Sequence, residues 1–425
     1  MTGPDPLPRV AVVFDFGSAT PMSILASARG LAEIVFLCDR NLPHVRALFD
    51  DIRTLARVCD ITGLTDDRIL AAPDCAGLAG ITTFSESRIA RTAALAERLG
   101  LCFLDRRAAA AVTDKYTQRR LLAEAGVQHT ECRVVRDPAG LDTALDTVGL
   151  PAVLKPRRGA ASARTCTVHT RQEAAAQLRA FTVPGGGEFV VERLLPGDPS
   201  VAGREWADYV SVESVISHGV IRHVEVTGKF PLAPPLRETG YVVPSTLGED
   251  MRARVLHLAG AALVALGIRH GIAHTEVKLT PDGPRIIEVN GRLGGYVADL
   301  VRRARGFDLV RAALTVALGR TGDTAATTYR RHAFQYFLTP PMDAVAVRRL
   351  DGLDDLGRVP GIRFVETFAE PGTVLDWRRG TLTYLGIVHG SAPDHPGVLR
   401  LVDLVHRTLR IEYDHPPRGA ESGPA

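Results

Sequence analysis

Residues 271–295 place carboxylates, an amide and basic side chains at a spacing that suits metal binding. Apolar and polar residues alternate on both sides of residues 280–284, which predicts two strands joined by a turn. Because successive side chains of a strand point to opposite faces, His274, Glu276 and Lys278 should share one face. On the returning strand, the same alternation predicts a shared face for Ile286, Glu288, Asn290 and Arg292.

The register of this hairpin decides whether two carboxylates meet. If the turn centres on Asp282, Glu276 lies opposite Glu288, whereas a slip of one residue separates them. Carboxylate and amide oxygens are hard ligands that suit Mg²⁺, which commonly binds one or two carboxylates together with nucleotide phosphates. The alternative interpretation is an amphipathic hairpin with a solvated charged face. A merely wet surface would be unusual here, because the run Glu-x-Asn-x-Arg is flanked by apolar residues, namely Ile286, Ile287, Val289 and Leu293.

The composition is that of a globular protein of two or three domains. The 425 residues are 45% hydrophobic and 23% charged, with a net charge of +3, and no run of 18 apolar residues occurs. The charge is too small to favour nucleic-acid binding, and the six cysteines lack metal-ligand spacing. The N-terminus has no basic segment followed by an apolar one. These features predict a cytoplasmic protein with reduced cysteines and with no nucleic-acid or membrane partner.

Lysine is rare in this sequence. Among the 51 basic residues the four lysines are Lys115, Lys155, Lys229 and Lys278. A chain that otherwise uses arginine retains lysine where a compact, flexible ammonium is preferred to a planar guanidinium. Lys115 lies at the start of a predicted helix capped by Thr113 or Asp114, where a cation is unfavourable unless it meets an anion. Lys115 is therefore a candidate phosphate ligand, with a solvated surface lysine as the alternative.

The N-terminal part of the chain alternates between apolar strands and helices. Strands are expected at residues 9–14, 32–38 and 80–84, with helices at 21–30 and 89–99 and a closing strand at 101–104. This order predicts a parallel α/β layer. The loop 15–18 has no GxGxxG pattern, so it does not indicate a dinucleotide site. As a loop at the carboxyl end of a strand, it is still a natural place for a small ligand.

Further along, a strand that ends on a lysine leads into a loop of small residues. The strand covers residues 149–156, the loop 157–164, and a second strand 165–169. This order predicts a flap in which backbone N–H groups and Lys155 meet phosphates. The alternative is a plain hairpin with a basic tip. The next strand, 188–192, leads into an apolar linker whose backbone groups could read an adenine edge.

The apolar spacing also predicts the rest of the chain. Two antiparallel strands are followed by a proline-rich loop, 231–244, which would cover a site. The expected elements are strands at 208–217 and 220–227, with Lys229 just beyond them, and helices at 250–267, 299–305, 309–318 and 396–408. Short strands after residue 330 predict a small appended α+β subdomain. The tail after Tyr413 is expected to be disordered.

In this order, the pieces resemble the ATP-grasp superfamily over residues 9–415. The motifs are an α/β pre-domain, the DK helix start, the VLKP strand with its loop, an E-x-L-L linker and the E…E-x-N-x-R hairpin. HTEVKLTPDGPRIIEVNGRLGG and VTGKFPLAPPLRETG resemble the L-amino-acid (dipeptide) ligases of that superfamily, which join a carboxylate to an amine. The resemblance implies an α/β and α+β fold with an N-terminal pre-ATP-grasp domain (1–108), an ATP-grasp domain (109–325, flexible lobe about 130–195), a C-terminal α+β subdomain (326–415) and a disordered tail (416–425).

The resemblance also implies roles for individual residues. Mg²⁺, with Mn²⁺ as an alternative, would be bound by Glu276, Glu288 and Asn290. The nucleotide would be bound by Lys115, Lys155, Ser162, Lys229, Lys278, Glu192, the backbone of Leu194, and Asp208 at the ribose, with Glu205 as a rival. Substrates would contact Arg237, Glu238, His274, Arg292, Gly294 and Gly295. The flap departs from the family pattern, because it holds a single glycine, Gly159.

The implied reaction is ATP-dependent amide formation. The γ-phosphoryl group of ATP would pass to a carboxylate, and an amine would attack the acyl phosphate, releasing ADP and phosphate. The catalytic groups would be Arg292, Lys155, Glu276 and Glu288, with His274 and Glu238 as candidate bases. The substrates would be amino acids or a specialised-metabolite acid, and a homodimer is the default assembly. The alternatives are a bicarbonate-activating, biotin-carboxylase-like enzyme, although no biotin-acceptor segment is present, and a nucleotide-binding protein without turnover.

Overall fold

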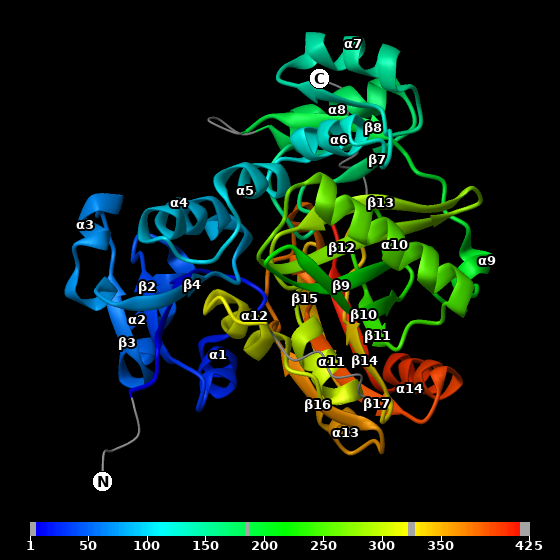
Figure 1. The fold of residues 1–425 in the computed structure, drawn as a ribbon. Helices are drawn as coiled ribbons and strands as arrows, with labels where there is room; N and C mark the ends of the chain where they lie inside the picture. The colour runs from blue at the N-terminus through cyan, green and yellow to red at the C-terminus, as the bar shows by residue number, and fades with distance from the viewer. Residues whose placement is uncertain (1–5, 183–186, 322–327, 417–425) are drawn as a thin grey trace.

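The N-terminal layer is a parallel sheet covered by helices. The computed structural model describes residues 6–182, 187–321 and 328–416, and Figure 1 shows this layer in blue on the left. The sheet has the order β3-β2-β1-β4, with β1 (Arg9–Phe14), β2 (Glu33–Cys38), β3 (Arg57–Asp60) and β4 (Leu78–Thr82). Around it lie α1 (Pro21–Ala28), α2 (Pro43–Leu55), α3 (Asp66–Leu70), α4 (Ile89–Leu99) and the 3₁₀ turns η1 (Pro73–Cys75) and η2 (Glu86–Arg88).

The parallel arrangement agrees with the prediction, but the expected closing strand at 101–104 is wrong. The fourth strand is β3, which pairs with β2 in register Val35↔Arg57 to Cys38↔Asp60. Residues 101–104 instead connect two helices, because Asp105 caps α5 (Arg106–Val112) with a hydrogen bond from the backbone N–H of Ala108. Residues 101–104 form a bend instead of a strand, because they pair with none of the described strands.

A small lobe follows, built from an antiparallel sheet and two helices. Its strands are ordered β5-β8-β6-β7, with β5 (Cys132–Val135), β6 (Ala152–Pro156), β7 (Cys166–Val168) and β8 (Phe189–Arg193). The helices α7 (Pro138–Val148) and α8 (Arg171–Phe181) pack on it around a separate core that includes Leu141, Leu154 and Phe181. In Figure 1 this lobe stands above the rest of the molecule. The helix α6 (Lys115–Glu124) leads into it, capped by Asp114 as one of the two predicted caps.

The large sheet has eight antiparallel strands in the order β13-β12-β9-β10-β11-β14-β17-β16. Its members are β9 (Tyr209–Ser217), β10 (Val220–Lys229), β11 (Gly240–Val243), β12 (Gly271–Thr280), β13 (Gly283–Asn290), β14 (His332–Phe337), β16 (Ile362–Thr367) and β17 (Gly386–Ala392). The strands after residue 330 therefore extend this sheet. Only β15 (Ala346–Asp351) and β18 (Arg410–Asp414), among the described residues of that part, pair apart from it.

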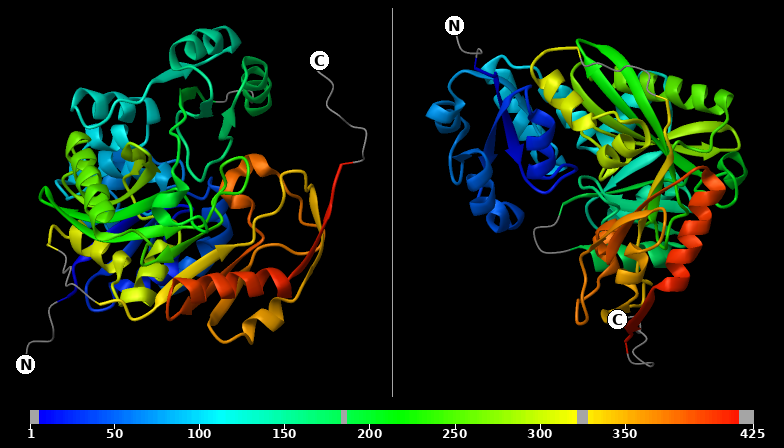
Figure 2. Two further views of the ribbon diagram at one scale, coloured as in Figure 1. Left: turned by 90° about the vertical axis from the view of Figure 1, so that its right-hand side faces the viewer. Right: turned by 90° about the horizontal axis from the view of Figure 1, so that it is seen from below.

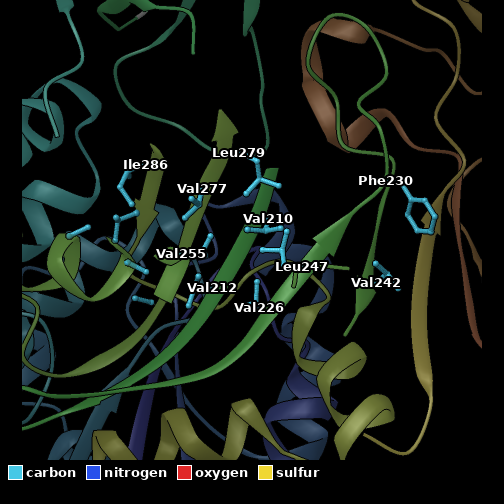
Figure 3. Close-up of a cluster of buried hydrophobic side chains, with 14 of the residues drawn as sticks. Val210, Val212, Val226, Phe230, Val242, Leu247, Val255, Val277, Leu279 and Ile286 are labelled. Atoms are coloured by element: carbon cyan, nitrogen blue, oxygen red, sulfur yellow. The ribbon is translucent and has the colours of Figure 1, made fainter. Parts of the chain in front are cut away.

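Both faces of the large sheet are covered. On one face, Val210, Val226 and Val277 join a core with Val255 of α10 (Glu249–Ala265), as Figure 3 shows. On the other face, Val215 joins α11 (Val297–Arg305) and α12 (Leu309–Ala317), which also contact the N-terminal layer. Figure 2 shows α14 (His395–Thr408) in red, lying against the large sheet. The remaining short elements are α9 (Pro199–Ala202), α13 (Leu353–Gly357) and η3 (Trp377–Thr383). Because both faces are covered, every residue of β9 is buried.

Residues 240–243, at the end of the proline-rich stretch expected to be a loop (231–244), form strand β11 instead. Lys229 does not lie beyond its strand, because β10 runs on to it and pairs Lys229 with Tyr241 of β11. The expected domain boundary near residue 325 and nearly all of the expected tail, 416–425, lie outside the described residues. Within the described ranges, the structure contains no helix whose length and apolar character would allow it to span a membrane.

Candidate active site

One large cavity lies where the N-terminal layer, the small lobe, the large sheet and the chain after residue 376 meet. Its walls include residues 159–163 of the predicted flap, the linker after β8 and the hairpin of β12 and β13. Thirteen side chains or loop positions predicted from the sequence line it, namely Lys115, Lys155, Ser162, Glu192, Leu194, Glu238, His274, Glu276, Lys278, Glu288, Asn290, Arg292 and Gly295. Segments far apart in the sequence thus converge on one space.

The hairpin register places two carboxylates opposite each other, as predicted. Glu276 pairs with Glu288 and His274 with Asn290. The turn is tighter than expected, because Thr280 pairs with Gly283, and a β-bulge near Ile287 restores the register. The bulge makes one prediction wrong. Ile286 does not share a face with Glu288 but lies in the core, and Ile287 lines the cavity instead.

A chain of charged groups holds Glu276 from behind. His274 Nδ1 donates to Glu213 Oε1 over 2.7 Å, and His274 Nε2 lies 3.5 Å from Glu276 Oε1. Burial disfavours the charged imidazole, but the Glu213 carboxylate outweighs it and raises the pKa of His274 to about 9. Burial likewise opposes ionisation of Glu276, yet the His274 hydrogen bond and charge lower its pKa to about 2. Glu276 is therefore held as a carboxylate.

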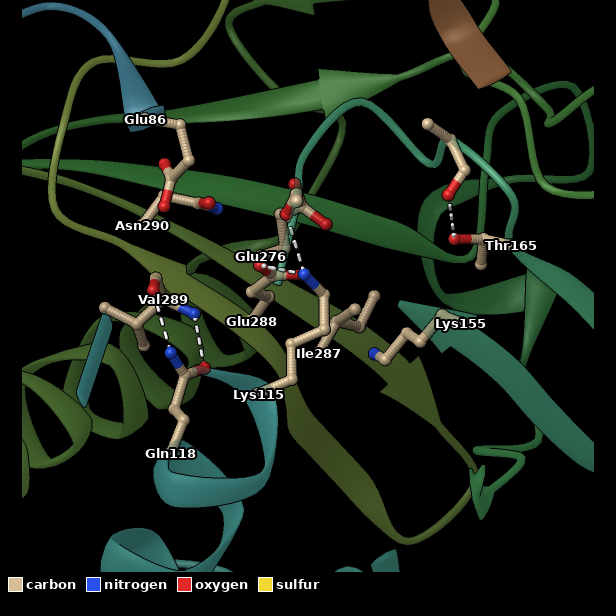
Figure 4. Close-up of polar contacts among 12 residues, drawn as sticks. Glu86, Lys115, Gln118, Lys155, Thr165, Glu276, Ile287, Glu288, Val289 and Asn290 are labelled. Carbon is tan, nitrogen blue, oxygen red and sulfur yellow. Dashed lines mark hydrogen bonds and ion pairs between the residues drawn. The ribbon is translucent and has the colours of Figure 1, made fainter. Parts of the chain in front are cut away.

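Glu288 and Asn290 meet basic groups across the same space. Lys115 Nζ lies 3.2 Å from Glu288 Oε1 and donates to the carbonyl of Gly159 over 2.8 Å, so this lysine connects the hairpin to the flap. Arg292 donates through Nε to Glu86 Oε2 over 3.1 Å and through Nη2 to Asn290 Oδ1 over 3.4 Å. Figure 4 shows Glu86, Asn290, Glu288 and Lys115 around one space.

The donor set suits a hard divalent cation with few protein ligands. Glu276 and Glu288 supply carboxylate oxygens from facing strands, and Asn290 supplies an amide oxygen. In the described ranges, no group of three His, Cys, Asp or Glu side chains lies close enough to form a site by itself. Mg²⁺ commonly binds one or two carboxylates and completes its shell with water and phosphate oxygens. The residues present therefore fit a magnesium ion that arrives with a nucleotide.

The side of the cavity that faces the small lobe carries a buried charge network. Lys155 Nζ lies 2.6 Å from Glu192 Oε1, and Arg119 donates to both oxygens of Glu192 at 2.9 and 3.1 Å. Burial works against the Glu192 charge, but Arg119 and Lys155 lower the pKa of Glu192 to about 2. The linker residues Arg193 to Leu195 and the flap continue this wall. A cavity of this kind offers cations and backbone groups to a polyphosphate.

Comparison with known proteins agrees with this geometry. Residues 148–299 match the family model of the ATP-grasp domain. These residues form an ATP-grasp domain. The match includes the flap, the linker after β8 and both facing carboxylates of the hairpin, Glu276 and Glu288.

Two sequence relatives and one solved structure are similar to this chain, and the solved structure has the same fold. The alanine–anticapsin ligase of Bacillus subtilis (strain 168) is 27% identical over 273 residues, which is 60% of this chain and 58% of that protein. Carnosine synthase 1 of Homo sapiens is 26% identical over 263 residues, which is 57% of this chain and 31% of that protein. A crystal structure of an L-amino acid ligase from Bacillus licheniformis has a TM-score of 0.76 at 21% identity, covering 96% of this chain and 99% of that one. The chain thus spans less than two thirds of either sequence relative, and its fold is the ATP-grasp fold.

Four of the predicted residues do not line the ATP-grasp cavity. Asp208 pairs with Lys278 over 2.7 Å, and the fully buried Lys229 pairs with Glu238 over 3.0 Å. Asp208 and Lys229 therefore each form an ion pair with a residue that lines the cavity, without lining it themselves. Arg237 is buried too and donates to the carbonyl of Pro234 and to Thr383 Oγ1. At Gly294 a Cβ atom would lie 2.5 Å from His274 Nδ1, which explains the glycine. The rival ribose acid, Glu205, does not line the cavity either.

The sequence places the stretches 15–18 and 231–244 near a ligand, but it does not single out the following lining or supporting residues individually. They are Glu86 from the loop after β4, Arg119, Glu213, Thr381, and the aromatic residues Phe16, Tyr209, Tyr241, Tyr296, Phe337 and Tyr384. Glu213 had a usable signal, because a glutamate inside the apolar run YVSVESVIS must be paired if the strand is buried. Glu86 had none, because a glutamate in an exposed-looking loop is indistinguishable from surface charge. Burial raises the pKa of Glu86, while the charge of Arg292 lowers it in part.

Proposed function

We propose that this protein is an ATP- and Mg²⁺-dependent carboxylate–amine ligase that forms an amide bond and releases ADP and phosphate. The observation that carries the proposal is the cavity in which Glu276 and Glu288 face each other, with Lys115, Lys155 and Arg292 around them. The relatives named as an alanine–anticapsin ligase and a carnosine synthase support amide formation. The substrates proposed are an amino acid or a related carboxylic acid, and an amine.

The cations of the cavity would offset the charge of phosphoryl transfer. The γ-phosphoryl group of ATP moves to a carboxylate oxygen, which forms an acyl phosphate and leaves ADP. Positioning and charge neutralisation dominate such a transfer. Lys155 is held by Glu192 and Lys115 by Glu288, so both ammonium groups are oriented before a nucleotide arrives. A magnesium ion on Glu276, Glu288 and Asn290 would supply further neutralisation of the phosphate oxygens.

Arg292 is proposed to bind the acid end of the substrate. Its guanidinium is oriented by Glu86 and by Asn290 Oδ1, and it faces the same space as the two carboxylates. It can hold a carboxylate before transfer and an oxyanion when the amine attacks the acyl phosphate. Attack forms the C–N bond and expels phosphate, and the amine loses one proton. His274 is unsuited as the base for that proton, because both ring nitrogens already face carboxylates.

The experiment is phosphate release from Mg·ATP across a panel of amino acids, alone and in pairs, with the nucleotide product identified. ADP and phosphate formed only with a particular pair, together with an amide detected by mass spectrometry, would support the ligase. AMP and pyrophosphate would mean adenylation and would overturn the proposed mechanism. ATP turnover without any amide would also contradict it. A cytoplasmic location and a homodimeric assembly stay predictions for separate measurement.

A further inference from the structure

A segment after β16 contacts the flap, whose residues 159–163 line the cavity. We call residues 157–164 the flap and residues 376–384, which contain η3, the latch segment. The backbone N–H of Arg164 donates to the carbonyl of Arg378 over 2.8 Å. In the other direction, the backbone N–H of Thr381 donates to the carbonyl of Ala161 over 2.9 Å. These two segments are joined like strands, although neither belongs to a sheet.

Gly380 allows this approach. Its φ is +67°, and a Cβ atom there would lie 2.2 Å from the carbonyl oxygen of Ala161 and 2.6 Å from the backbone nitrogen of Ala163. Backbone atoms cannot move aside as a flexible side chain can, so any larger residue would push the flap away. The contact is therefore specified by the sequence at this position.

A ring contact fixes the latch segment to the small lobe. Trp377 packs edge-to-face on Phe181 of α8, with ring centroids 5.8 Å apart and an interplanar angle of 67°. Phe181 belongs to the core of the lobe, and Trp377 packs against that core. Arg164 Nη1 also donates to the carbonyl of Phe181 over 3.3 Å. The latch segment thus holds both the lobe and its flap.

Thr381 connects the flap to the proline-rich loop. While its N–H holds Ala161, its Oγ1 accepts a hydrogen bond from the backbone N–H of Glu238 over 3.1 Å. Thr381 is 5% exposed and lines the cavity together with Leu382 and Glu238. One residue therefore touches the phosphate-covering flap and the loop that carries a predicted substrate residue.

The flap needs such support because its backbone is unusual. Ala161, Ser162 and Arg164 have φ values of +57°, +53° and +50°, a region that residues other than glycine rarely adopt. Conformations of this kind persist only when surrounding contacts hold them. For Ala161 and Arg164, the latch segment supplies such contacts through the two backbone hydrogen bonds with Thr381 and Arg378.

We propose that residues 376–384 are a latch that positions the flap over the cavity, and that Thr381 couples the flap to the proline-rich loop. The proposal rests on the proposed function, because it assigns the latch to the acyl phosphate. With the flap held, water is kept from the acyl phosphate, and amide formation follows phosphoryl transfer. With the flap released, the acyl phosphate would hydrolyse, so ATP would be consumed without an equal amount of amide.

The first test measures, in the full chain, hydrogen–deuterium exchange of the two amides that join the flap to the latch segment, those of Arg164 and Thr381. Gly380→Ala should accelerate exchange at Arg164 and Thr381 at least about tenfold, because both hydrogen bonds are displaced. Gly372→Ala is the matched control, since Gly372 also has a positive φ (+92°) but has nothing within 4 Å of its Cβ position. Trp377→Leu, which removes the ring contact, should act in the same direction. Equal exchange in wild type and in both latch variants would overturn the proposal, whatever the enzyme's activity.

The second test separates the latch from the proposed function. Wild type should give one ADP per amide, whereas Gly380→Ala should give at least about two, with ADP formation retained. Thr381→Val keeps the N–H but loses the acceptor for Glu238, so it should raise KM for the acid or amine at least about threefold, with unchanged nucleotide affinity. Thr381→Ser should restore the wild-type KM. If the wild-type protein makes no amide, the proposed ligase function is wrong. If the wild-type protein makes amide and Gly380→Ala also forms one ADP per amide, the proposed latch is wrong.

Discussion

The side-chain amide of Gln118 pairs with the backbone of Val289 as a neighbouring strand would. Gln118 Nε2 donates to the carbonyl of Val289 over 2.9 Å, and the N–H of Val289 donates to Gln118 Oε1 over 2.8 Å (Figure 4). β13 is the edge of the large sheet, so these groups have no strand to bind. Gln128 makes the same two-way contact with Ile286. The strand that carries Glu288 and Asn290 is therefore held by side chains of another segment.

Gln118→Leu should loosen this edge. The change leaves a buried N–H and a buried carbonyl of Val289 without partners, and each unsatisfied group costs about 1–3 kcal/mol. We expect Gln118→Leu to have a lower thermal midpoint and faster hydrogen exchange at Val289 than wild type. Gln118→Glu keeps the acceptor, so its values should lie between those of wild type and Gln118→Leu. Gln172→Leu, at an exposed position on α8, is the control. A variant whose Val289 amide exchanges as slowly as in wild type would show that the pairing is unimportant.

Glu288→Gln should reduce ADP formation at least about 100-fold, the scale for removing one group that stabilises transition-state charge. The amide keeps the size of the side chain but loses the negative charge that faces Glu276 and Lys115. The measurement is ADP release in the presence of the identified substrates, with the circular dichroism spectrum as a check of folding. Glu97→Gln, on the exposed face of α4, should keep full activity. Near-normal turnover in Glu288→Gln would remove the hairpin from the mechanism.

Lys155→Met should weaken binding of a non-hydrolysable ATP analogue about tenfold or more. A charged hydrogen bond contributes about 1.5–3 kcal/mol, and methionine fills the same space without the ammonium. Glu192 keeps its two contacts with Arg119, so the buried carboxylate is not left alone. Titration calorimetry with Mg²⁺ present measures the affinity. Arg179→Met, an exposed change on the same lobe, controls for net charge; equal affinity in both variants would rule out Lys155 as a phosphate ligand.

Glu192→Gln should change how stability depends on pH. Folding lowers the pKa of Glu192 from 4.5 to about 2, because the pull of Arg119 and Lys155 exceeds the effect of burial. The stabilisation is therefore complete above the unfolded value and is lost as the pH falls towards 2. At pH 3.5 wild type should have lost about 1.4 kcal/mol of it, the equivalent of one pKa unit. Urea unfolding at pH 7 and 3.5 measures the gap between wild type and variant, which should narrow by that amount. An equal difference in unfolding free energy at both pH values would contradict the stabilisation of the Glu192 carboxylate by Arg119 and Lys155.

The sequence by itself determined much of the site on the hairpin. Strand alternation places His274 and Glu276 on one face, because the period of two is a local property of an extended chain. The facing of Glu276 and Glu288 followed from the position of the turn, and the structure confirms it. The same reasoning failed at Ile286, because alternation cannot anticipate a bulge, which is decided by how the edge strand packs.

Tertiary structure alone decided which distant groups complete the cavity. Arg292 meets Glu86 from 206 positions away, and Gln118 meets Val289 from 171 positions away. Thr381 reaches the flap from a segment that shows no motif. Such contacts depend on how separate sheets and loops pack against one another, and no spacing along the chain encodes that. The sequence therefore defined the groups that can do chemistry, whereas packing determined which residues orient them and which segment holds the flap.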